Sequence, residues 1–136
     1  MDINIMRLLF DTGLLVLIWM VQILIYPSFK HYDKQNLVIW HKHYAVRLAV
    51  IVIPLMFGQL ILASMQCFKT SSNQTLISLL LVIVVWMLTF IQFVPLHKKI
   101  AKNKATVTLL KRLVNKNWWR TLLWTLIFCW SVYTNL

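Results

Sequence analysis

The sequence predicts an all-α integral membrane protein, a single-domain four-helix bundle with its N- and C-termini on the outer side. Three observations predict this. First, 60% of the 136 residues are apolar and only 12% are charged, against about half and about a quarter in soluble globular proteins. Second, four stretches approach the roughly 20 apolar residues that a membrane-crossing helix needs. Third, the positive charges gather in two of the connections between these stretches.

The four predicted spans cover residues 7–26, 44–68, 76–96 and 118–133. Pro27 is predicted to end the first span and Pro54 to kink the second, because proline has no N–H to donate. The polar cluster at 70–73 predicts a tight turn between the second and third spans. We expect the first span to be retained, since Asp11 interrupts its start and no small-residue cleavage motif follows.

The charge distribution predicts the orientation. The sequence holds 14 Lys and Arg against 3 Asp and no Glu, a net charge of +11. Apart from Arg7 and Lys69, all of the positive charges lie in or beside the connections after the first and third spans. The positive-inside rule places these two connections in the cytoplasm, as in a bacterial inner-membrane protein. A mean hydropathy of +0.73 argues against a nucleic-acid partner, which strong basicity alone would suggest.

The basic linker 98–117 separates the last two predicted spans. Its part from 103 to 117 is amphipathic, with lysines and arginines beside leucines and valines. Such a segment is predicted to lie along the inner membrane surface and to bind anionic lipid headgroups. A role in binding a partner protein is the alternative.

Polar side chains from all four helices are predicted to meet at one level on the cytoplasmic half of the bundle. Arginine binds carboxylates and phenolates bidentately, and histidine exchanges protons near neutral pH. These residues therefore predict a pocket for a hydrophobic acidic or phenolic small molecule. The ligand-binding candidates are Gln22, Arg47, Gln92, Asn117 and Arg120, and the catalytic candidates are His43 and His97. In the alternative interpretation the arginines reach lipid phosphates and the protein is a non-enzymatic membrane subunit.

Haem or metal binding is a further alternative. His43 and His97 are the pair that could supply axial ligands from facing helices. Both lie at helix ends, and too few Cys or acidic residues surround them for a four-ligand site. We therefore expect no metal and no cofactor.

Two more pairs have structural interpretations. Arg7 and Asp11 have the i,i+4 spacing of an ion pair within one helix. Cys67 and Cys129 fall at different depths and are expected to be free thiols, because a disulfide needs Cα atoms within about 7 Å. The sequence contains no nucleotide-binding, hydrolase or redox-dithiol motif.

The third span ends in Pro95-Leu96-His97, and Asn117-Trp118-Trp119-Arg120 opens the fourth. This layout resembles the small four-helix membrane proteins related to anthrone oxygenase and covers most of the chain. Pro95, His97, Trp118 and Arg120 would match that family, although His97 stands where it commonly has Asn. The resemblance implies a cofactor-free oxygenation of a polyphenolic molecule. A cofactor-free oxygenase or isomerase-like enzyme for a phenol or quinone-like substrate is accordingly an alternative function. The sequence leaves open whether the protein is an enzyme or an accessory subunit. It also leaves open whether the protein is a monomer or a homo-oligomer.

Overall fold

The computed structural model describes residues 1–102 and 104–136, and every regular element in this part of the chain is helical. The first helical run consists of α1 (Ile3–Met20), the π-helical turn η1 (Val21–Ile25), α2 (Tyr26–Ser28) and the 3-10 turn η2 (Phe29–His31). The second run is α3 (Lys34–Lys69). The third consists of α4 (Asn73–Leu88), the π-helical turn η3 (Thr89–Phe93) and α5 (Val94–Ala101). The last is α6 (Val107–Asn135).

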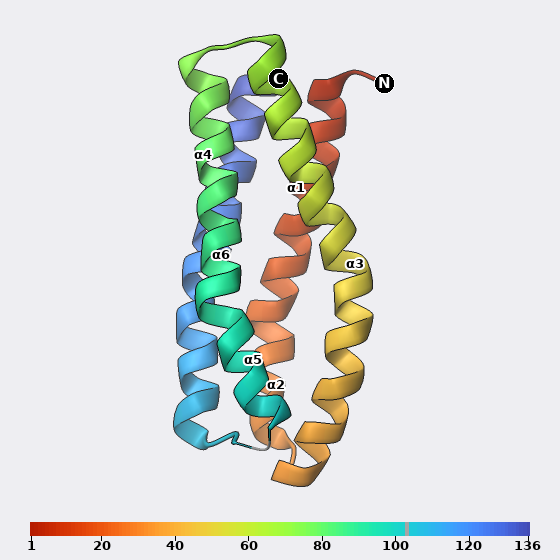
Figure 1. Ribbon diagram of the computed structural model, residues 1–136, viewed down its shortest axis with the longest axis vertical. Helices are drawn as coiled ribbons and strands as arrows, with labels where there is room; N and C mark the ends of the chain where they lie inside the picture. The colour runs from red at the N-terminus through yellow and green to blue at the C-terminus, as the bar shows by residue number, and fades with distance from the viewer. Residues whose placement is uncertain (103) are drawn as a thin grey trace.

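The long helices form an elongated bundle (Figure 1). α1 packs against α3 and α6, and α4 packs against the same two helices from the other side. Both termini lie at the end of the bundle that also holds the turn between α3 and α4 (Figure 1). The turn before α3 and the connection between α5 and α6 lie at the opposite end. We call these the terminal end and the basic end of the bundle.

Three of the helical runs are long and apolar enough to cross a membrane: Ile3–His31, Lys34–Lys69 and Asn73–Ala101. α6 is equally long but less apolar, because it carries Lys111, Arg112, Lys116 and Arg120 and is rich in Trp and Thr. Large apolar side chains also cover the outside of the bundle, as at Val50 (71% exposed) and Ile91 (66%). An apolar exterior of this kind suits a lipid environment.

Two helices begin about ten residues earlier than predicted because of side-chain caps. The Asp33 carboxylate accepts a hydrogen bond from the Asn36 N–H (2.7 Å) and starts α3 at Lys34. The Thr106 hydroxyl does the same for the Leu109 N–H (3.0 Å) at the start of α6. Each cap satisfies an N–H that has no partner within its helix.

The predicted linker 98–117 is consequently not a separate surface segment. Its first residues belong to α5, and from Val107 onward it continues without a break into α6. Leu109, Leu113 and Asn117 of this stretch are buried in the bundle. The prediction of a helix lying along the membrane surface before the last span is therefore wrong for residues 107–117.

Of the two prolines whose effects were predicted, Pro27 does not act as expected. Pro27 does not end the first helical run, which continues to His31 because proline is tolerated at the start of α2. Pro54 lies inside α3, and Figure 1 shows α3 changing direction part-way along its length. A kink is expected where proline removes a helical hydrogen bond.

Close helix packing holds the centre together. Leu14, Ile18, Val82, Val85 and Ile127 are at most 2% exposed. α1 and α3 approach each other closely at Gly58, where a Cβ atom would overlap the Phe10 ring. Small residues allow such approaches between membrane helices, whose association depends on packing because lipid is as apolar as the side chains.

A buried polar network lies in the half of the bundle near the termini. The Arg7 Nε donates to Asp11 (2.9 Å to Oδ2), which confirms the predicted ion pair, and both side chains are fully buried. Gln59 donates to the Asp11 Oδ1 (2.7 Å), and Gln66 accepts from the Arg7 Nη1 (3.2 Å). Gln66 also donates to the side-chain carbonyls of Asn4 and Asn135, at 2.9 Å each. The network therefore joins α1, α3 and α6.

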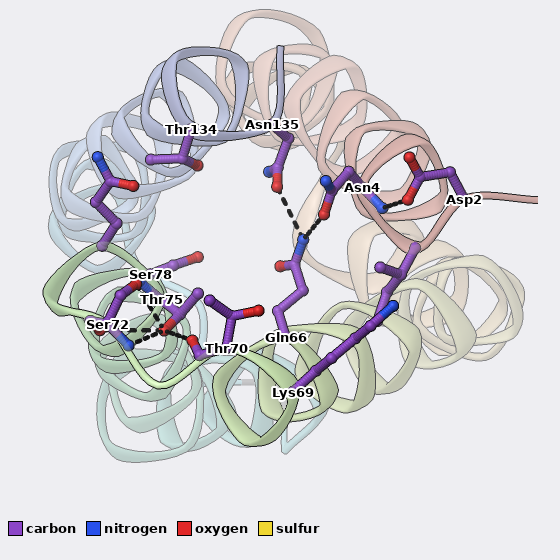
Figure 2. Close-up of a pocket in the computed structure, with 12 residues that line it drawn as sticks. Asp2, Asn4, Gln66, Lys69, Thr70, Ser72, Thr75, Ser78, Thr134 and Asn135 are labelled. Atoms are coloured by element: carbon purple, nitrogen blue, oxygen red, sulfur yellow. Dashed lines mark hydrogen bonds between the residues drawn. The ribbon is translucent and has the colours of Figure 1, made fainter.

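A polar pocket of about 230 Å³ opens above this network at the terminal end. Figure 2 shows Gln66 between Asn4 and Asn135 at its edge, with Ser72, Thr75 and Ser78 across the opening. These residues already bond to one another: Ser72 and Thr75 form the capping box of α4, for example. We interpret this pocket as a hydrated entrance to a structural network.

Candidate ligand-binding site

Two π-helical turns shape the bundle near its basic end. Each precedes a proline by a short distance: η1 ends before Tyr26-Pro27, and η3 ends before Val94-Pro95. The Tyr26 N–H bonds to the Val21 carbonyl and the Val94 N–H to the Thr89 carbonyl, five residues back in both cases. Such wide turns alter the phase of a helix and are frequent at functional sites. The side chains that follow them, Tyr26 and His97, meet in the interior.

Tyr26, His97 and His41 form a continuous hydrogen-bonded chain. The Tyr26 hydroxyl lies 2.8 Å from the His97 Nε2, and the His97 Nδ1 lies 2.7 Å from the His41 Nε2. The two imidazoles are stacked, with ring centroids 5.0 Å apart. The hydroxyl and each ring nitrogen can donate or accept depending on the tautomer, so the bonds of this chain can all point either way. It can therefore pass a proton between Tyr26 and His41.

Two polar atoms beside this chain are buried without a hydrogen-bond partner among the described residues: the His41 Nδ1 and the Tyr44 hydroxyl. A buried polar atom that lacks a partner costs about 1–3 kcal/mol, so native proteins seldom leave one unused. Both residues line the same groove. A ligand in that groove would supply the missing partners.

The groove has a volume of about 510 Å³, within the range of small-molecule sites. It lies between α3 and the third helical run, η3 with the parts of α4 and α5 beside it. Apolar side chains dominate its length, and the polar ones gather at the basic end. The lining residues are Tyr26, His41, Tyr44, Ala45, Leu48, Ala49, Val52, Ile53, Met56, Phe57, Trp86, Thr89, Phe90, Val94, His97, Lys98, Ala101 and Arg120.

Arg120 supplies a buried positive charge to this groove. Its side chain is only 9% exposed, and its guanidinium lies 4.1 Å above the centre of the Phe93 ring and 5.5 Å from that of Trp124. The Nε donates to the Asn117 Oδ1 (3.1 Å). Aromatic faces attract a cation, but they do not neutralise it.

All three acidic side chains of the protein are engaged elsewhere. Asp2 caps α1 through the Asn4 N–H (3.0 Å), and Asp33 caps α3. Asp11 pairs with Arg7. Within the described part of the chain, the Arg120 guanidinium therefore has no carboxylate partner. Since a buried unpaired charge is costly, this arginine is suited to an anion that the protein itself does not provide.

A second layer of hydrogen bonds holds Arg120 in place. Asn117 donates from its Nδ2 to the Gln22 Oε1 (2.9 Å), and the Thr121 hydroxyl donates to the same oxygen (3.0 Å). Gln22 in turn donates to the Val114 carbonyl (3.2 Å). Asn117 is fully buried and Gln22 nearly so. The Asn117 side-chain carbonyl that accepts from Arg120 is thus held in position by contacts between α6 and η1.

The structure brings together four of the predicted site residues: Gln22, Asn117 and Arg120 in one hydrogen-bonded group, and His97 beside them. Gln92 is half-buried, its Oε1 has no partner among the described residues, and it does not line the groove. His43 and Arg47 are exposed on the outside of α3. Neither faces the groove.

His41 takes the place that the sequence suggested for His43. Because α3 begins at Lys34 rather than Tyr44, its buried face is set by Leu37, His41 and Tyr44. Their spacing of four and three residues is that of one helix face, and this signal was available in the sequence. His43 is two residues from His41 and therefore points away.

The sequence suggested His43 and His97 as the pair that could bind haem or a metal. In the structure it is His41, not His43, that faces His97. Their facing nitrogens bond directly at 2.7 Å, which leaves no space for an ion between them. Among the described residues, no three His, Cys, Asp or Glu side chains are grouped as metal ligands. Cys67 and Cys129 are free thiols, as predicted.

A second cavity of about 370 Å³ lies at the basic end, on another side of Tyr26. Lys30, Lys34 and Lys111 surround it, and Leu37 and Leu110 are among its apolar residues. Among the residues that the structure describes, none of those lining it is acidic. It suits an anionic group attached to an apolar one.

Comparison of the chain with protein-family profiles, curated proteins and solved structures finds no match. The resemblance to proteins related to anthrone oxygenase therefore stays a prediction.

Proposed function

We propose that this protein is a four-span inner-membrane protein that binds a hydrophobic molecule with an acidic or phenolic head at the basic end of the bundle. The observation that carries this proposal is the buried Arg120, which has aromatic and amide neighbours but no carboxylate. An anionic head in the groove would pair with the guanidinium. It would also be within the part of the groove that His41 and Tyr44 line.

Access from the bilayer supports this function. Ile53 and Phe57 line the groove and are about half exposed, on the surface that lipid tails would cover. A ligand dissolved in the membrane could thus enter sideways and carry its head to Arg120 without crossing water. Sites of this kind combine an apolar wall with a few placed polar groups.

The orientation belongs to the same proposal. Lysines gather at the basic end. Trp118 and Trp119 lie about three turns into α6 from that end and are exposed, at 49% and 61%. Positive charge and interfacial tryptophans are typical of the cytoplasmic membrane surface. We place both termini outside on this basis. The cavity with Lys30, Lys34 and Lys111 would then hold an anionic phospholipid headgroup, in place of the surface helix expected from sequence.

The test is ligand binding by the full-length protein in mild detergent. Calorimetry would compare 4-nonylphenol and dodecanoate with the neutral dodecanol, for wild type, Arg120→Gln and the control Arg112→Gln. Arg112 lies on the same helix but is exposed. We expect Arg120→Gln to weaken dodecanoate binding at least thirtyfold, since losing one partner of a buried charge pair costs about 2–5 kcal/mol. Equal binding by the two arginine variants, or tight binding of dodecanol, would refute the proposal.

A second candidate function is proton transfer to or from the bound molecule, as in an enzyme acting on phenols or quinone-like compounds. The chain from Tyr26 through His97 to His41 favours it. In one tautomer the His41 Nδ1 is an acceptor, and a proton taken there would displace one toward Tyr26. Tyr26 also lines the basic cavity, which is the route by which we would expect the proton to leave.

Oxygen uptake with anthrone as substrate tests this second function. We expect uptake by wild type and its loss in His41→Ala, with His43→Ala as the matched control on the exposed face of α3. Uptake that is unaffected by His41→Ala would exclude the relay, and no uptake by wild type would exclude an oxygenase that acts on anthrone.

A further inference from the structure

The groove is long as well as apolar, and its length bears on the identity of the ligand. It follows α3 from His41 to Phe57, sixteen residues along the helix. At a rise of 1.5 Å per residue this is about 24 Å. A compact ring compound would occupy only a fraction of such a length. The shape matches an extended chain instead.

Small side chains make room for that chain. Ala45 and Ala49 are four residues apart and share one face of α3. Leu48 lies between them, and beyond them the wall is formed by Val52 and Met56. Polar atoms are confined to the basic end, apart from those of Thr89 and Trp86. The Trp86 Nε1 is buried without a partner among the described residues. The groove therefore has a polar basic end and a largely apolar length, with one unused N–H donor in its far part.

Aromatic side chains line the part of the groove that lies farther from the basic end. The Phe57 and Trp86 rings pack edge to face with centroids 5.0 Å apart, and Phe90 lies beside Trp86 at 5.7 Å. All three line the groove. A tail that ran the length of the groove would contact these rings.

The head group follows from the charge at the basic end. Arg120 provides one buried cation, and the Tyr44 hydroxyl provides a hydrogen-bond donor that has no partner among the described residues. A carboxylate carries one negative charge and two acceptor oxygens, and it pairs with a guanidinium bidentately. A carboxylate head thus meets the charge and the unused donor together.

From these features we propose that the ligand is a long, single-chain fatty acid, with its carboxylate at Arg120 and its tail along α3 toward Phe57. This inference rests on the proposed function and specifies its ligand. The tail lies against lipid on one side, so the acid can exchange directly with the bilayer. The length of the groove then determines which chain lengths of fatty acid bind well.

The experiment uses the full-length protein in detergent with tritiated octanoate and palmitate, measured by scintillation proximity. Val52→Trp would fill the groove about 12 Å along α3 from Tyr44, beyond the reach of an eight-carbon acid. Val50→Trp is the matched control, because Val50 is 71% exposed and does not line the groove. Comparing variants in the same detergent cancels the partition of each acid into micelles.

We expect Val52→Trp to weaken palmitate binding at least tenfold and to leave octanoate within twofold of wild type, while Val50→Trp changes neither. Arg120→Gln should weaken both acids. If Val52→Trp fails to fold, as judged by its melting curve, Val52→Phe replaces it with the same expectation.

The results distinguish a failure of the fatty-acid inference from a failure of the proposed function. If both acids bind through Arg120 but Val52→Trp affects neither, or both equally, the fatty-acid inference falls and the proposed function stands. Tighter Arg120-dependent binding of 4-nonylphenol or of two-tailed phosphatidic acid than of palmitate also overturns the inference. If no acid binds in an Arg120-dependent way, the proposed function falls with it.

Discussion

The facing ring nitrogens of His41 and His97, 56 residues apart in the chain, lie 2.7 Å from each other. This bond joins α3 to α5 at the level where Tyr26 contributes its hydroxyl from α2. Three helical runs thus converge on one hydrogen-bonded chain beside the groove. The contact ties these helical runs together at the basic end of the bundle.

Removing His97 should destabilise the protein. His97→Ala leaves the Tyr26 hydroxyl and the His41 Nε2 without their partners and opens a cavity, which together cost about 2–5 kcal/mol. Unfolding in mixed micelles measures the free energy. The control His43→Ala alters an exposed side chain and should stay within about 0.5 kcal/mol of wild type. A cost for His43→Ala equal to that of His97→Ala would contradict the assignment of His41 to the interior.

The buried ion pair should be sensitive to the loss of one charge. Asp11→Asn leaves the fully buried Arg7 unpaired, and breaking such a pair costs about 3–5 kcal/mol. The double variant Arg7→Met, Asp11→Leu removes both charges and should recover most of this loss. Asp2→Asn is the matched control, because Asn caps a helix as well as Asp does. If the double variant were less stable than Asp11→Asn, the pair would have to stabilise the fold in its own right.

Because α1 and α3 pack closely at Gly58, replacing this glycine with a larger residue should lower the stability of the protein. Gly58→Ala drives a methyl group into the Phe10 ring, and overpacking of this kind costs about 1–3 kcal/mol. Phe10→Ala should relieve the penalty in the double variant. At Gly13 an added Cβ would lie 3.4 Å from Leu55, an ordinary contact, so Gly13→Ala should be tolerated. Thermal unfolding of the four variants checks the prediction, and equal melting temperatures for both glycine variants would disprove it.

Reporter fusions test the orientation. Alkaline phosphatase, which is active only outside the cytoplasm, should be active when fused at the C-terminus after α6. Green fluorescent protein fused there through the same export route should be dark. The opposite pattern would place the basic end outside and would reverse the positive-inside assignment. A fusion in the turn between α3 and α4 should match the C-terminal one, because both lie at the terminal end of the bundle (Figure 1).

Helix content, the apolar exterior and the shared end of the termini were all predictable. Long apolar stretches determine helices in lipid, since every backbone group must be paired within its segment. The Arg7–Asp11 pair was predictable too. Both residues lie on one helix, so their spacing alone brings them together and the neighbouring helices need not be known. The start of α3 was missed because the polar residues 34–43 do not continue the apolar run, although Asp33 marked the cap.

By itself the sequence determined where the charges and apolar stretches lie, and hence that three to four helices can cross a membrane. It also restricted the acidic side chains to three, which limits the possible partners of any buried cation. Only the tertiary structure decided that Arg120 is buried and that no carboxylate reaches it. It also decided that the imidazole of His41 meets that of His97 and the hydroxyl of Tyr26, although the spacing of Leu37, His41 and Tyr44 already favoured His41 over His43 as the inward residue. The physical reason is helix phase: the wide turns η1 and η3 rotate the side chains that follow them, and neither net hydropathy nor charge records that rotation.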